Sequence, residues 1–322
     1  MAFTRRSLLA AAAAMTGASV FAQEGEYPNR PVRVINPYTP GGSVDPVLRP
    51  LSLKLQELLG QSVITDYKPG AGTNIGSDFV AKSKPDGYTL LLATSSLAIS
   101  PALHKNLGYD ALRDLTPVAY IGDQPFSIVV STALPFKTIP ELLAYARANP
   151  GKLSFGSSGN GGAVHLGMEL FKSMTGTNML HIPYKGGAQT LTAMLAGDIQ
   201  LMLSPPSNFA QHIASGRVRM IGMASNKRVP GFDVPTIAEQ GVPGYTSGVW
   251  YAIYAPAATP QPILDKLHQI ITRAVADKQV QDVYQKLALV PGGGTIDELK
   301  ANLRAEIARW DKVVKESGAK ID

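Results

Sequence analysis

The sequence contains no cysteine among its 322 residues. This absence excludes disulfide bonds, thiolate catalysis, cysteine-ligated zinc and lipid attachment through an N-terminal cysteine. The five histidines, at positions 104, 165, 181, 212 and 268, do not have the spacing of metal ligands. We therefore expect neither a metal site nor a cofactor.

The motifs of the common enzyme and nucleotide-binding families are also missing. The Gly-x-Ser-x-Gly elbow of hydrolases fails at Asn160, where the second glycine would stand. A dinucleotide-binding motif fails at Val164, and Gly151-Lys152 lacks the upstream glycine of a phosphate-binding loop. No run of basic residues is long enough to follow a nucleic-acid backbone. These absences favour a binding protein over an enzyme and exclude nucleic acid as the expected partner.

The N-terminal segment has the three parts of an export signal. Arg5 and Arg6 form a charged start, 8–20 form an apolar stretch too short for a membrane span, and 20–22 form a small-residue cleavage site. We expect residues 1–22 to be a signal peptide and the mature protein to be periplasmic. The route stays open between the Sec and the twin-arginine pathways, because Arg5-Arg6 also fits the latter. An uncleaved anchor is the alternative, but nothing after Ala22 continues the apolar run.

The composition is that of a globular protein with two packed units. Apolar residues make up 45% of the chain and charged residues 17%. Roughly 300 residues remain after cleavage, which is more than one hydrophobic core usually serves. Loss of Arg5 and Arg6 lowers Lys plus Arg from 30 to 28 against 24 acidic residues, a formal charge of +4. This modest positive charge favours anionic small molecules.

Strand-like and helical segments alternate along most of the chain, which predicts an α/β architecture with mostly parallel sheets. We expect lobe 1 to comprise 23–122 and 231–322, and lobe 2 to comprise 123–230. The expected strands are 31–38, 61–67, 88–94, 126–130, 153–155, 180–183, 199–203, 218–224 and 248–255, and the expected helices are 46–59, a segment around Ile75 and Phe79, 139–146, 163–174, 188–196, 260–276 and 295–317.

The loop from Tyr38 to Pro46 follows the first strand and is the sharpest candidate site. Gly41 and Gly42 let the backbone turn with its amides exposed, and Asp45 can cap the helix that Pro46 begins. In open α/β sheets, ligands bind at the carboxyl ends of strands, where helix N-termini attract anions. The loop therefore predicts a carboxylate or phosphate cradle, although an ordinary strand-to-helix turn would have the same glycine pair.

A second loop, 155–166, also joins a strand to a helix. It carries two hydroxyls, Ser157 and Ser158, and a glycine-rich run that ends at Gly162 and Ala163. Ordering four glycines in seven residues is entropically costly, which favours a binding role over mere flexibility. His165 follows one turn into the helix, where we expect a packed or capping imidazole instead of a catalytic base.

Two further loops end strands that can reach the same cleft. The third candidate is Thr94-Ser95-Ser96 at the end of the third strand, and the fourth begins with Tyr184 and Lys185 after the strand at 180–183. Lysine on a loop is usually a solvated charge, so we do not expect Lys185 to be the main anchor of a ligand.

Ten segments, in order along the mature chain, resemble the Bug-type solute-binding proteins, which are the extracytoplasmic receptors of tripartite tricarboxylate transporters. The segments are Pro28-x-Arg30-Pro31-Val32, Pro40-Gly41-Gly42-x-x-Asp45, Lys68-Pro69-Gly70-Ala71-Gly72-Thr73, Lys84-Pro85-Asp86-Gly87-Tyr88-Thr89-Leu90, Phe155-Gly156-Ser157-x-Gly159-x-Gly161, His165-Leu166, His181-Ile182-Pro183-Tyr184-Lys185-Gly186, Gly197-Asp198-Ile199-Gln200, Pro235-Thr236-Ile237-Ala238-Glu239 and Ala255-Pro256.

This resemblance implies a type II periplasmic-binding fold, in which two α/β lobes joined by two crossovers close over a carboxylate. It implies delivery of the ligand to membrane transporter subunits, and we expect a monomer. The implied ligand residues are Gly41, Gly42, Ser157, Ser158 and the amides of Gly162 and Ala163; Asp45 is expected to order its loop, because a carboxylate repels an anionic ligand. Together with Tyr38, Ser95, Ser96, Tyr184 and Ser204, these residues form the predicted site.

Two positions depart from the family pattern. Gly162 stands where many relatives have Ser or Thr, and Leu203-Ser204 stands where they often have Phe-Asp. The loop 203–208 borders the expected cleft, so the identity of the ligand cannot be taken from a relative. Loss of an acidic group there suits a more anionic or a bulkier apolar acid, with Tyr38, Tyr184 and Trp250 as aromatic walls.

Three other functions fit the sequence. An exported hydrolase or isomerase could use His165 with Ser157 or Ser158. A sensor of the same fold could signal through a membrane protein. An orphan receptor could have lost its ligand.

Overall fold

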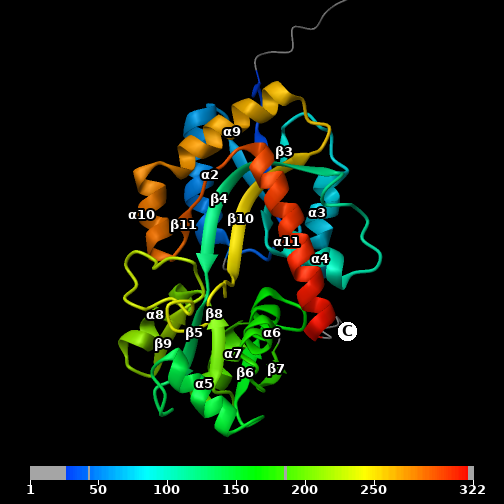
Figure 1. Cartoon of the computed structure of the whole chain (residues 1–322). Helices are drawn as coiled ribbons and strands as arrows, with labels where there is room; N and C mark the ends of the chain where they lie inside the picture. The colour runs from blue at the N-terminus through cyan, green and yellow to red at the C-terminus, as the bar shows by residue number, and fades with distance from the viewer. Residues whose placement is uncertain (1–26, 43, 185–186, 318–322) are drawn as a thin grey trace, which may run out of the picture.

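The structure of the chain is a computed structural model that describes residues 27–42, 44–184 and 187–317 (Figure 1). The predicted signal peptide, 1–22, lies outside the described residues, as do Ser43, Lys185 and Gly186. Within the described part of the chain, no helix combines the length and the apolar character needed to cross a membrane.

Lobe 1, the upper part of Figure 1, is built on a six-stranded sheet. Its strands are β1 Val32–Asn36, β2 Val63–Tyr67, β3 Thr89–Thr94, β4 Leu115–Pro125, β10 Gly248–Pro256 and β11 Val290–Pro291. β1 pairs in parallel with β2 and β3. β10 lies between β3 and β4 and is antiparallel to both, and β11 extends the far edge of β4.

Lobe 2, the lower part of Figure 1, has a five-stranded sheet in the order β7-β6-β8-β5-β9. Its strands are β5 Ser127–Ser131, β6 Ser154–Ser157, β7 Leu180–Pro183, β8 Leu201–Ser204 and β9 Val218–Met223. β6 is parallel to β7 and β8, whereas β5 is antiparallel to β8 and β9.

The α/β class is confirmed, but the expectation of mostly parallel sheets is wrong. That expectation assumed that a helix separates each strand from the next. Instead, β4 runs out of lobe 1 and β5 begins in lobe 2 after a single residue, Phe126. β10 then returns from lobe 2 into the middle of the first sheet, against the direction of β3 and β4. Strands that cross between lobes therefore account for the antiparallel pairs on β10.

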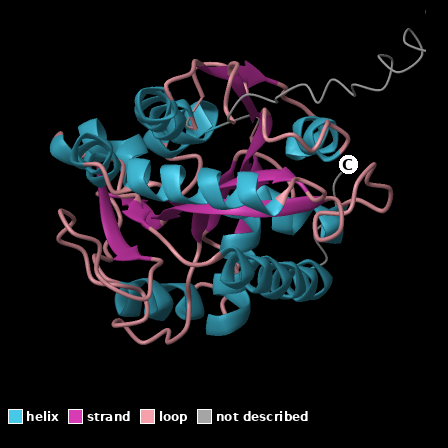
Figure 2. Ribbon diagram, turned by 90° about the horizontal axis from the view of Figure 1, so that it is seen from above, coloured by secondary structure: helices cyan, strands magenta, loops and turns pink. Residues whose placement is uncertain are grey.

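Helices cover both faces of the lobe 1 sheet, as the view from above shows (Figure 2). One face packs against α2 and α9 through Leu48, Leu51 and Leu267, and the other packs against α4 and α11 through Leu97 and Trp310. The bounds are α2 Asp45–Leu59, α3 Asn74–Ala81, α4 Ser96–Leu103, α9 Gln261–Val275, α10 Lys278–Lys286 and α11 Ile296–Ser317, with a 3-10 turn at Ala71–Thr73.

The sequence explains why α2 forms where it does. Leu48, Leu51 and Leu55 recur on one helical face and are all buried. Pro46 suits the first turn, where its missing N–H leaves no hydrogen bond unmade. Gly60 ends the helix with φ +64°, a left-handed conformation that glycine adopts without a steric cost.

Lobe 2 has its own core beneath its helices. Phe155, Phe171 and Leu203 are buried together there. The helices are α5 Ile139–Ala148, α6 Ala163–Thr175, α7 Gly187–Ala196 and α8 Ala210–Ala214, with a 3-10 turn η2 at Pro206–Phe209.

The two lobes are joined by the link between β4 and β5 and by the segment 224–247 between β9 and β10. In the second crossover, Ile237, Val242 and Tyr245 pack into the lobe 2 core. Lobe 1 also touches lobe 2 directly, because Leu166 of α6 is buried in the cluster that contains Trp310 of α11. The lobe boundaries at 122/123 and 230/231 stay predictions.

Candidate functional site

The predicted site residues lie where parallel strands end. In lobe 1, β1 and β3 end at Asn36 and Thr94 at the same edge of the sheet, and in lobe 2, β6 and β8 end at Ser157 and Ser204. Parallel strands present their carboxyl ends together, so each lobe gathers its predicted residues at one edge. The predicted members are Tyr38, Gly41, Gly42, Asp45, Ser95 and Ser96 in lobe 1, and Ser157, Ser158, Gly162, Ala163, Tyr184 and Ser204 in lobe 2.

Asp45 holds the first loop together. Its carboxylate accepts hydrogen bonds from the Gly41 N–H at 2.6 Å, from the Asn36 side-chain amide at 2.9 Å and from the Tyr67 hydroxyl at 3.1 Å. The prediction that Asp45 caps the helix begun by Pro46 is wrong, because the capping position is Val44 and no side chain caps there. Asp45 is instead the acidic residue in the first turn of α2, where its negative charge interacts favourably with the positive end of the helix dipole.

The amides of the first loop are used inside the loop. The Gly41 N–H donates to Asp45, and the Gly42 N–H donates to the Thr39 carbonyl oxygen at 3.2 Å. Gly41 has φ +74°, which favours glycine at this position. Ligand binding by Gly41 and Gly42 stays a prediction; in this conformation their N–H groups already have acceptors.

Tyr38 joins the two strand ends of lobe 1. Its hydroxyl lies 2.7 Å from the Thr94 Oγ1 atom and 3.2 Å from the Ser96 Oγ atom, and burial raises the pKa of Tyr38. Ser95, which is buried, precedes α4 and does not cap the helix with its side chain, although the Ser96 N–H donates to the Thr94 Oγ1 atom at 3.3 Å. The first turn of α4 also lacks an acidic residue. The beginning of α4 therefore keeps its positive dipole end beside the Tyr38 hydroxyl.

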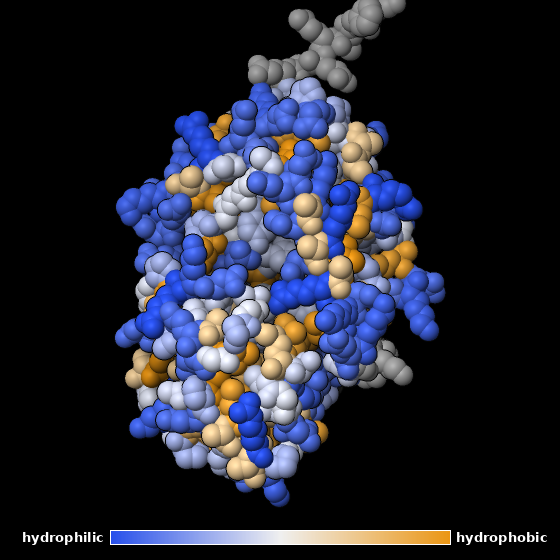
Figure 3. Space-filling model, viewed as in Figure 1, coloured by the Kyte–Doolittle hydropathy of each residue, from blue (hydrophilic) through white to orange (hydrophobic). Residues whose placement is uncertain are grey.

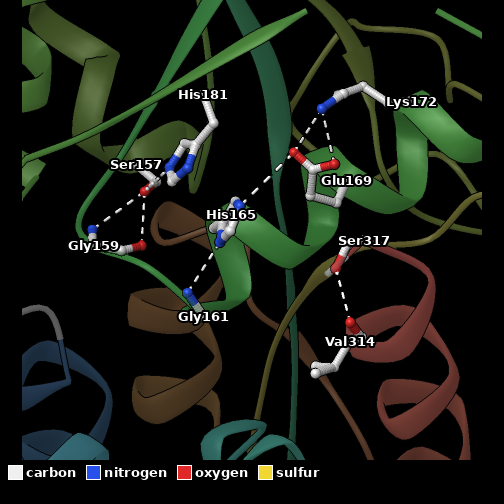
Figure 4. A network of polar contacts seen from close by, with 9 residues as sticks. All are labelled: Ser157, Gly159, Gly161, His165, Glu169, Lys172, His181, Val314 and Ser317. Atoms are coloured by element: carbon white, nitrogen blue, oxygen red, sulfur yellow. Dashed lines mark hydrogen bonds and ion pairs between the residues drawn. The ribbon is translucent and has the colours of Figure 1, made fainter. Parts of the chain in front are cut away.

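Ser157 is buried and holds the second loop in shape (Figure 4). Its hydroxyl donates to the Gly159 carbonyl oxygen at 2.8 Å and accepts from the Gly159 N–H at 3.2 Å. The His181 Nε2 atom lies 2.6 Å from the same oxygen. Since the Ser157 proton goes to Gly159, the compatible tautomer of His181 donates from Nε2. Ser158, the neighbouring residue, is exposed.

His165 is a structural residue of the second loop. Its Nδ1 atom accepts from the Gly161 N–H at 3.0 Å, and its ring stacks on His181 with centroids 3.8 Å apart. Phe155 also stacks on His181, with ring centroids 5.0 Å apart. Burial lowers the pKa of both histidines, that of His181 to about 4, with the neighbouring His165 and Lys172 adding to the effect on His181.

This geometry argues against acyl transfer by the second loop. The serine–histidine pair in the structure is Ser157 with His181, whereas the hydrolase hypothesis used His165. A serine that is 1% exposed offers no path to a substrate carbonyl. An imidazole whose pKa is about 4 is also a weak base near neutral pH.

The start of α6 differs from the start of α2. Gly162 precedes the helix, no side chain caps it, and the first turn contains no acidic residue. Gly162 is exposed and Ala163 is half-buried. The first amides of a helix have no acceptor within the helix, so this end attracts an anion. Gly162 therefore leaves a helix start without a side-chain cap.

The remaining predicted residues of lobe 2 lie nearby. Tyr184 donates its N–H to the Ser157 carbonyl oxygen at 2.9 Å, and the buried Ser204 hydroxyl accepts from the Asn208 side chain at 3.0 Å. Sequence reasoning placed His181 in a family motif without seeing its bond to Ser157. It also missed Asn36, whose position at a strand end was the available signal.

Lobe 2 reaches lobe 1 through Gly161. A Cβ atom at this position would stand 2.8 Å from the Cδ1 atom of Leu103, at the end of α4, and Gly161 has φ +71°. Close approach and backbone conformation both require glycine here. The second loop is thus in contact with the helix whose other end carries Ser96.

Trp250 is not an aromatic wall of this site. It lines a separate cavity with Asp123 and Arg309, behind the two crossovers. The pleat of β10 explains the error, since successive side chains point to opposite faces. Tyr251 joins the core with α2, while Trp250 packs on the face of α11.

A family model described as a tripartite tricarboxylate transporter family receptor matches residues 47–319. The chain belongs to this family. The resemblance seen in the sequence motifs is thereby confirmed, and so is the expectation of a binding protein, because the family and its solved members are binding proteins and not enzymes.

This receptor is similar in sequence to the protein BugT of Bordetella pertussis, at 37% identity over 92% of the chain and 91% of the relative. Among solved structures, it is similar to R. palustris Rpa4515 with adipate, at 34% identity and TM-score 0.81, covering 92% of the chain and 100% of that structure. The periplasmic binding protein BugD matches at 33% identity and TM-score 0.77 over the same shares. These neighbours confirm the type II periplasmic-binding fold.

Among the described residues, no group of three or more histidine, aspartate or glutamate side chains could hold a metal ion. The polar groups at the strand ends are instead hydroxyls and backbone amides, which suit the recognition of a carboxylate.

Proposed function

We propose that this receptor captures a small dicarboxylate between its lobes and delivers it to a tripartite membrane transporter. The observation that carries the proposal is the contrast between helix starts. α2 has its own anion, Asp45, whereas the first turns of α4 of lobe 1 and α6 of lobe 2 contain no acidic residue. Each of these two helix starts can therefore accept one carboxylate of the ligand.

The two helices come from different lobes, which relates binding to closure. Ser96 and Tyr38 stand at the start of α4, and Ser158 and Gly162 stand at the start of α6. A ligand shifts the balance between open and closed forms only through contacts that differ between them, and a molecule that bridges both helices makes such contacts. The adipate held by a solved relative supports a linear dicarboxylate.

The remaining parts of the proposal concern where the receptor works. The sequence of residues 1–22 and the periplasmic neighbours support export to the periplasm, by either the Sec or the twin-arginine route. The protein would act there as a monomer with lobes divided at 122/123 and 230/231. The membrane subunits of the transporter are its expected protein partners.

The test is a thermal-shift and calorimetric comparison of adipate with hexanoate, which has the same carbon chain and one carboxylate. Ligand at about 100 times its dissociation constant adds about 2.7 kcal/mol to the free energy of unfolding. We expect adipate to bind and hexanoate to bind at least about tenfold more weakly, because one charge-assisted contact is lost. Equal affinity for the two compounds would contradict the two-helix arrangement. A panel of citrate, aromatic acids and amino acids then defines the ligand class.

Two serine variants locate the ligand. Ser158→Ala should weaken adipate binding by about 1 kcal/mol without changing stability, because Ser158 is exposed. Ser157→Ala is the matched control: it should lower the melting temperature, since the Ser157 hydroxyl is bonded inside the loop. A reversed pattern would place the ligand against Ser157.

The membrane protein that binds the liganded receptor distinguishes a transport receptor from a sensor. Delivery to a transporter requires that the liganded receptor bind transporter subunits, so co-purification with a membrane signalling protein alone would favour a sensor.

A further inference from the structure

A cavity of about 720 Å³ lies behind the two crossovers, away from the strand ends described above. Figure 3 shows the corresponding face hollowed near its middle, over β4 and β10 in the view of Figure 1. Its walls come from both crossovers, at Asp123–Pro125 and 246–250, from the lobe 2 segment 224–230 and from α11 of lobe 1. This volume is within the usual range of small-molecule sites.

Asp123 supplies an anion to the cavity wall. Its carboxylate accepts from the Tyr120 hydroxyl at 2.6 Å, and within the described residues no lysine, arginine or histidine lies at ion-pair distance from it. Many protein atoms lie near the carboxyl, although the Asp123 side chain itself is exposed along the cavity wall. Burial, and then the nearby Glu306, raise the pKa of Asp123, while the Tyr120 hydrogen bond opposes them. A cation in the cavity would stabilise the ionised form of Asp123.

Three cationic side chains of the described residues line the cavity, and the two arginines among them already have acceptors; the third, Lys227, is exposed and forms no ion pair with Asp123. Arg309 donates to the Thr246 carbonyl oxygen and to Glu306, the latter at 3.2 Å. Arg228 is paired with Glu239 at 3.1 Å. Neither guanidinium is therefore placed to neutralise Asp123.

Trp250 contributes a hydrogen-bond donor that lacks an acceptor. Its indole Nε1 atom is buried and, among the described residues, has no hydrogen-bond acceptor. Its ring lies 6.5 Å from that of Tyr254 at an interplanar angle of 31°, and both line the cavity. The wall thus offers an anion and two aromatic rings, and an unused N–H donor lies just beneath its surface. Together these groups suit a cation with an acceptor and an apolar body.

We propose that this cavity at the two crossovers, called the hinge cavity below, is a second ligand site. It binds a small organic amine that carries an aromatic or apolar body and a hydrogen-bond acceptor. The ammonium group binds Asp123, the acceptor receives the Trp250 N–H, and the body lies along Trp250 and Tyr254. The proposal does not depend on the carboxylate function of the strand-end site.

The test uses three probes on the purified mature receptor, measured by calorimetry. Tyramine has the ammonium, the ring and an acceptor; phenethylamine lacks the acceptor; 4-ethylphenol lacks the ammonium. We expect saturable binding of one molecule of tyramine, weaker binding of phenethylamine and the weakest binding of 4-ethylphenol.

Two variants assign the contacts. Asp123→Asn should weaken tyramine binding about tenfold or more while leaving 4-ethylphenol unchanged, because only a charged contact is lost. Trp250→Phe should weaken tyramine more than phenethylamine, because both lose contact with part of the indole ring but only tyramine loses the N–H contact. Ser158→Ala, at the strand-end site, should leave tyramine unchanged, and unaltered adipate binding by the hinge variants would show that they fold.

Two results would overturn the proposal. One is the absence of saturable binding for all three probes by the wild-type receptor. The other is tyramine binding that survives Asp123→Asn but is lost in Ser158→Ala, which would place the amine in the cleft between the strand ends.

Discussion

The first and second loops are both held in shape by side-chain hydrogen bonds, but a charged group does this in the first loop and neutral groups do it in the second. In lobe 1, the carboxylate of Asp45 gathers three donors and stands at the start of α2. In lobe 2, the neutral pair Ser157 and His181 fixes the loop, and the start of α6 has no acidic residue. An internal anion makes the first loop self-sufficient, whereas the second loop is ordered without one. Under the proposed function, the second loop is therefore the one that receives an external anion.

The largest effect is expected from Asp45→Ala, which removes the internal anion. The Gly41 N–H, the Asn36 amide and the Tyr67 hydroxyl would lose their common acceptor, so the free energy of unfolding should fall by about 2–4 kcal/mol. Chemical denaturation measures this change. Glu57→Ala, on the exposed face of the same helix, is the control. If both variants unfold alike, Asp45 does not organise the loop.

A smaller effect is expected from Gly161→Ala, which challenges the contact between the second loop and α4. The new Cβ atom would meet Leu103 and the backbone would be held at φ +71°, so stability should fall by about 1–3 kcal/mol, with weaker adipate binding. Gly159→Ala has φ +131° with open space around it and so isolates the backbone strain. Addition of Leu103→Ala to Gly161→Ala should restore part of the binding; no recovery would mean that the contact with Leu103 does not matter for closure.

The smallest effect concerns the neutral pair and pH. The pKa of His181 is lowered to about 4 in the folded chain, so below about pH 6.5 the unfolded state takes up the proton first. The stabilisation is complete above pH 6.5 and is lost as the pH falls to about 4; we expect about 1–2 kcal/mol, since the ring is half-buried. His181→Gln, which keeps a donor for Ser157, should flatten this part of the stability curve. An unchanged slope in that variant would assign the effect to other groups, with His165 as the next residue to test.

Much of the fold could be predicted from periodicity and turn residues. The segments 46–59 and 163–174 have clear helical patterns with glycine after them, and the structure has α2 and α6 there. β4 was missed, because its buried run contains Pro117, Gly122 and Pro125, which weaken a strand signal. The start of α4 was interpreted as a loop because Ser95 and Ser96 are typical of turns.

The site was harder to predict than the fold, because it depends on which hydroxyls are already bonded. Ser157 and Ser158 are equivalent in the sequence, yet one is buried against His181 and the other is exposed. The face of β10 was equally hidden, so Trp250 was placed on the wrong side of the sheet. Local patterns identify the strand ends, but tertiary contacts decide which groups there remain available.

The position of β10 also determines the order in which the two lobes can fold. This strand lies between β3 and β4, although more than half of the chain precedes it. During synthesis, every strand of lobe 2 emerges before β10 does, so lobe 2 can assemble while the first sheet is still divided into two unpaired halves. The edges of β3 and β4 stay exposed until β10, their common partner, is synthesised. Nascent lobe 1 is therefore the half of the molecule most in need of a chaperone.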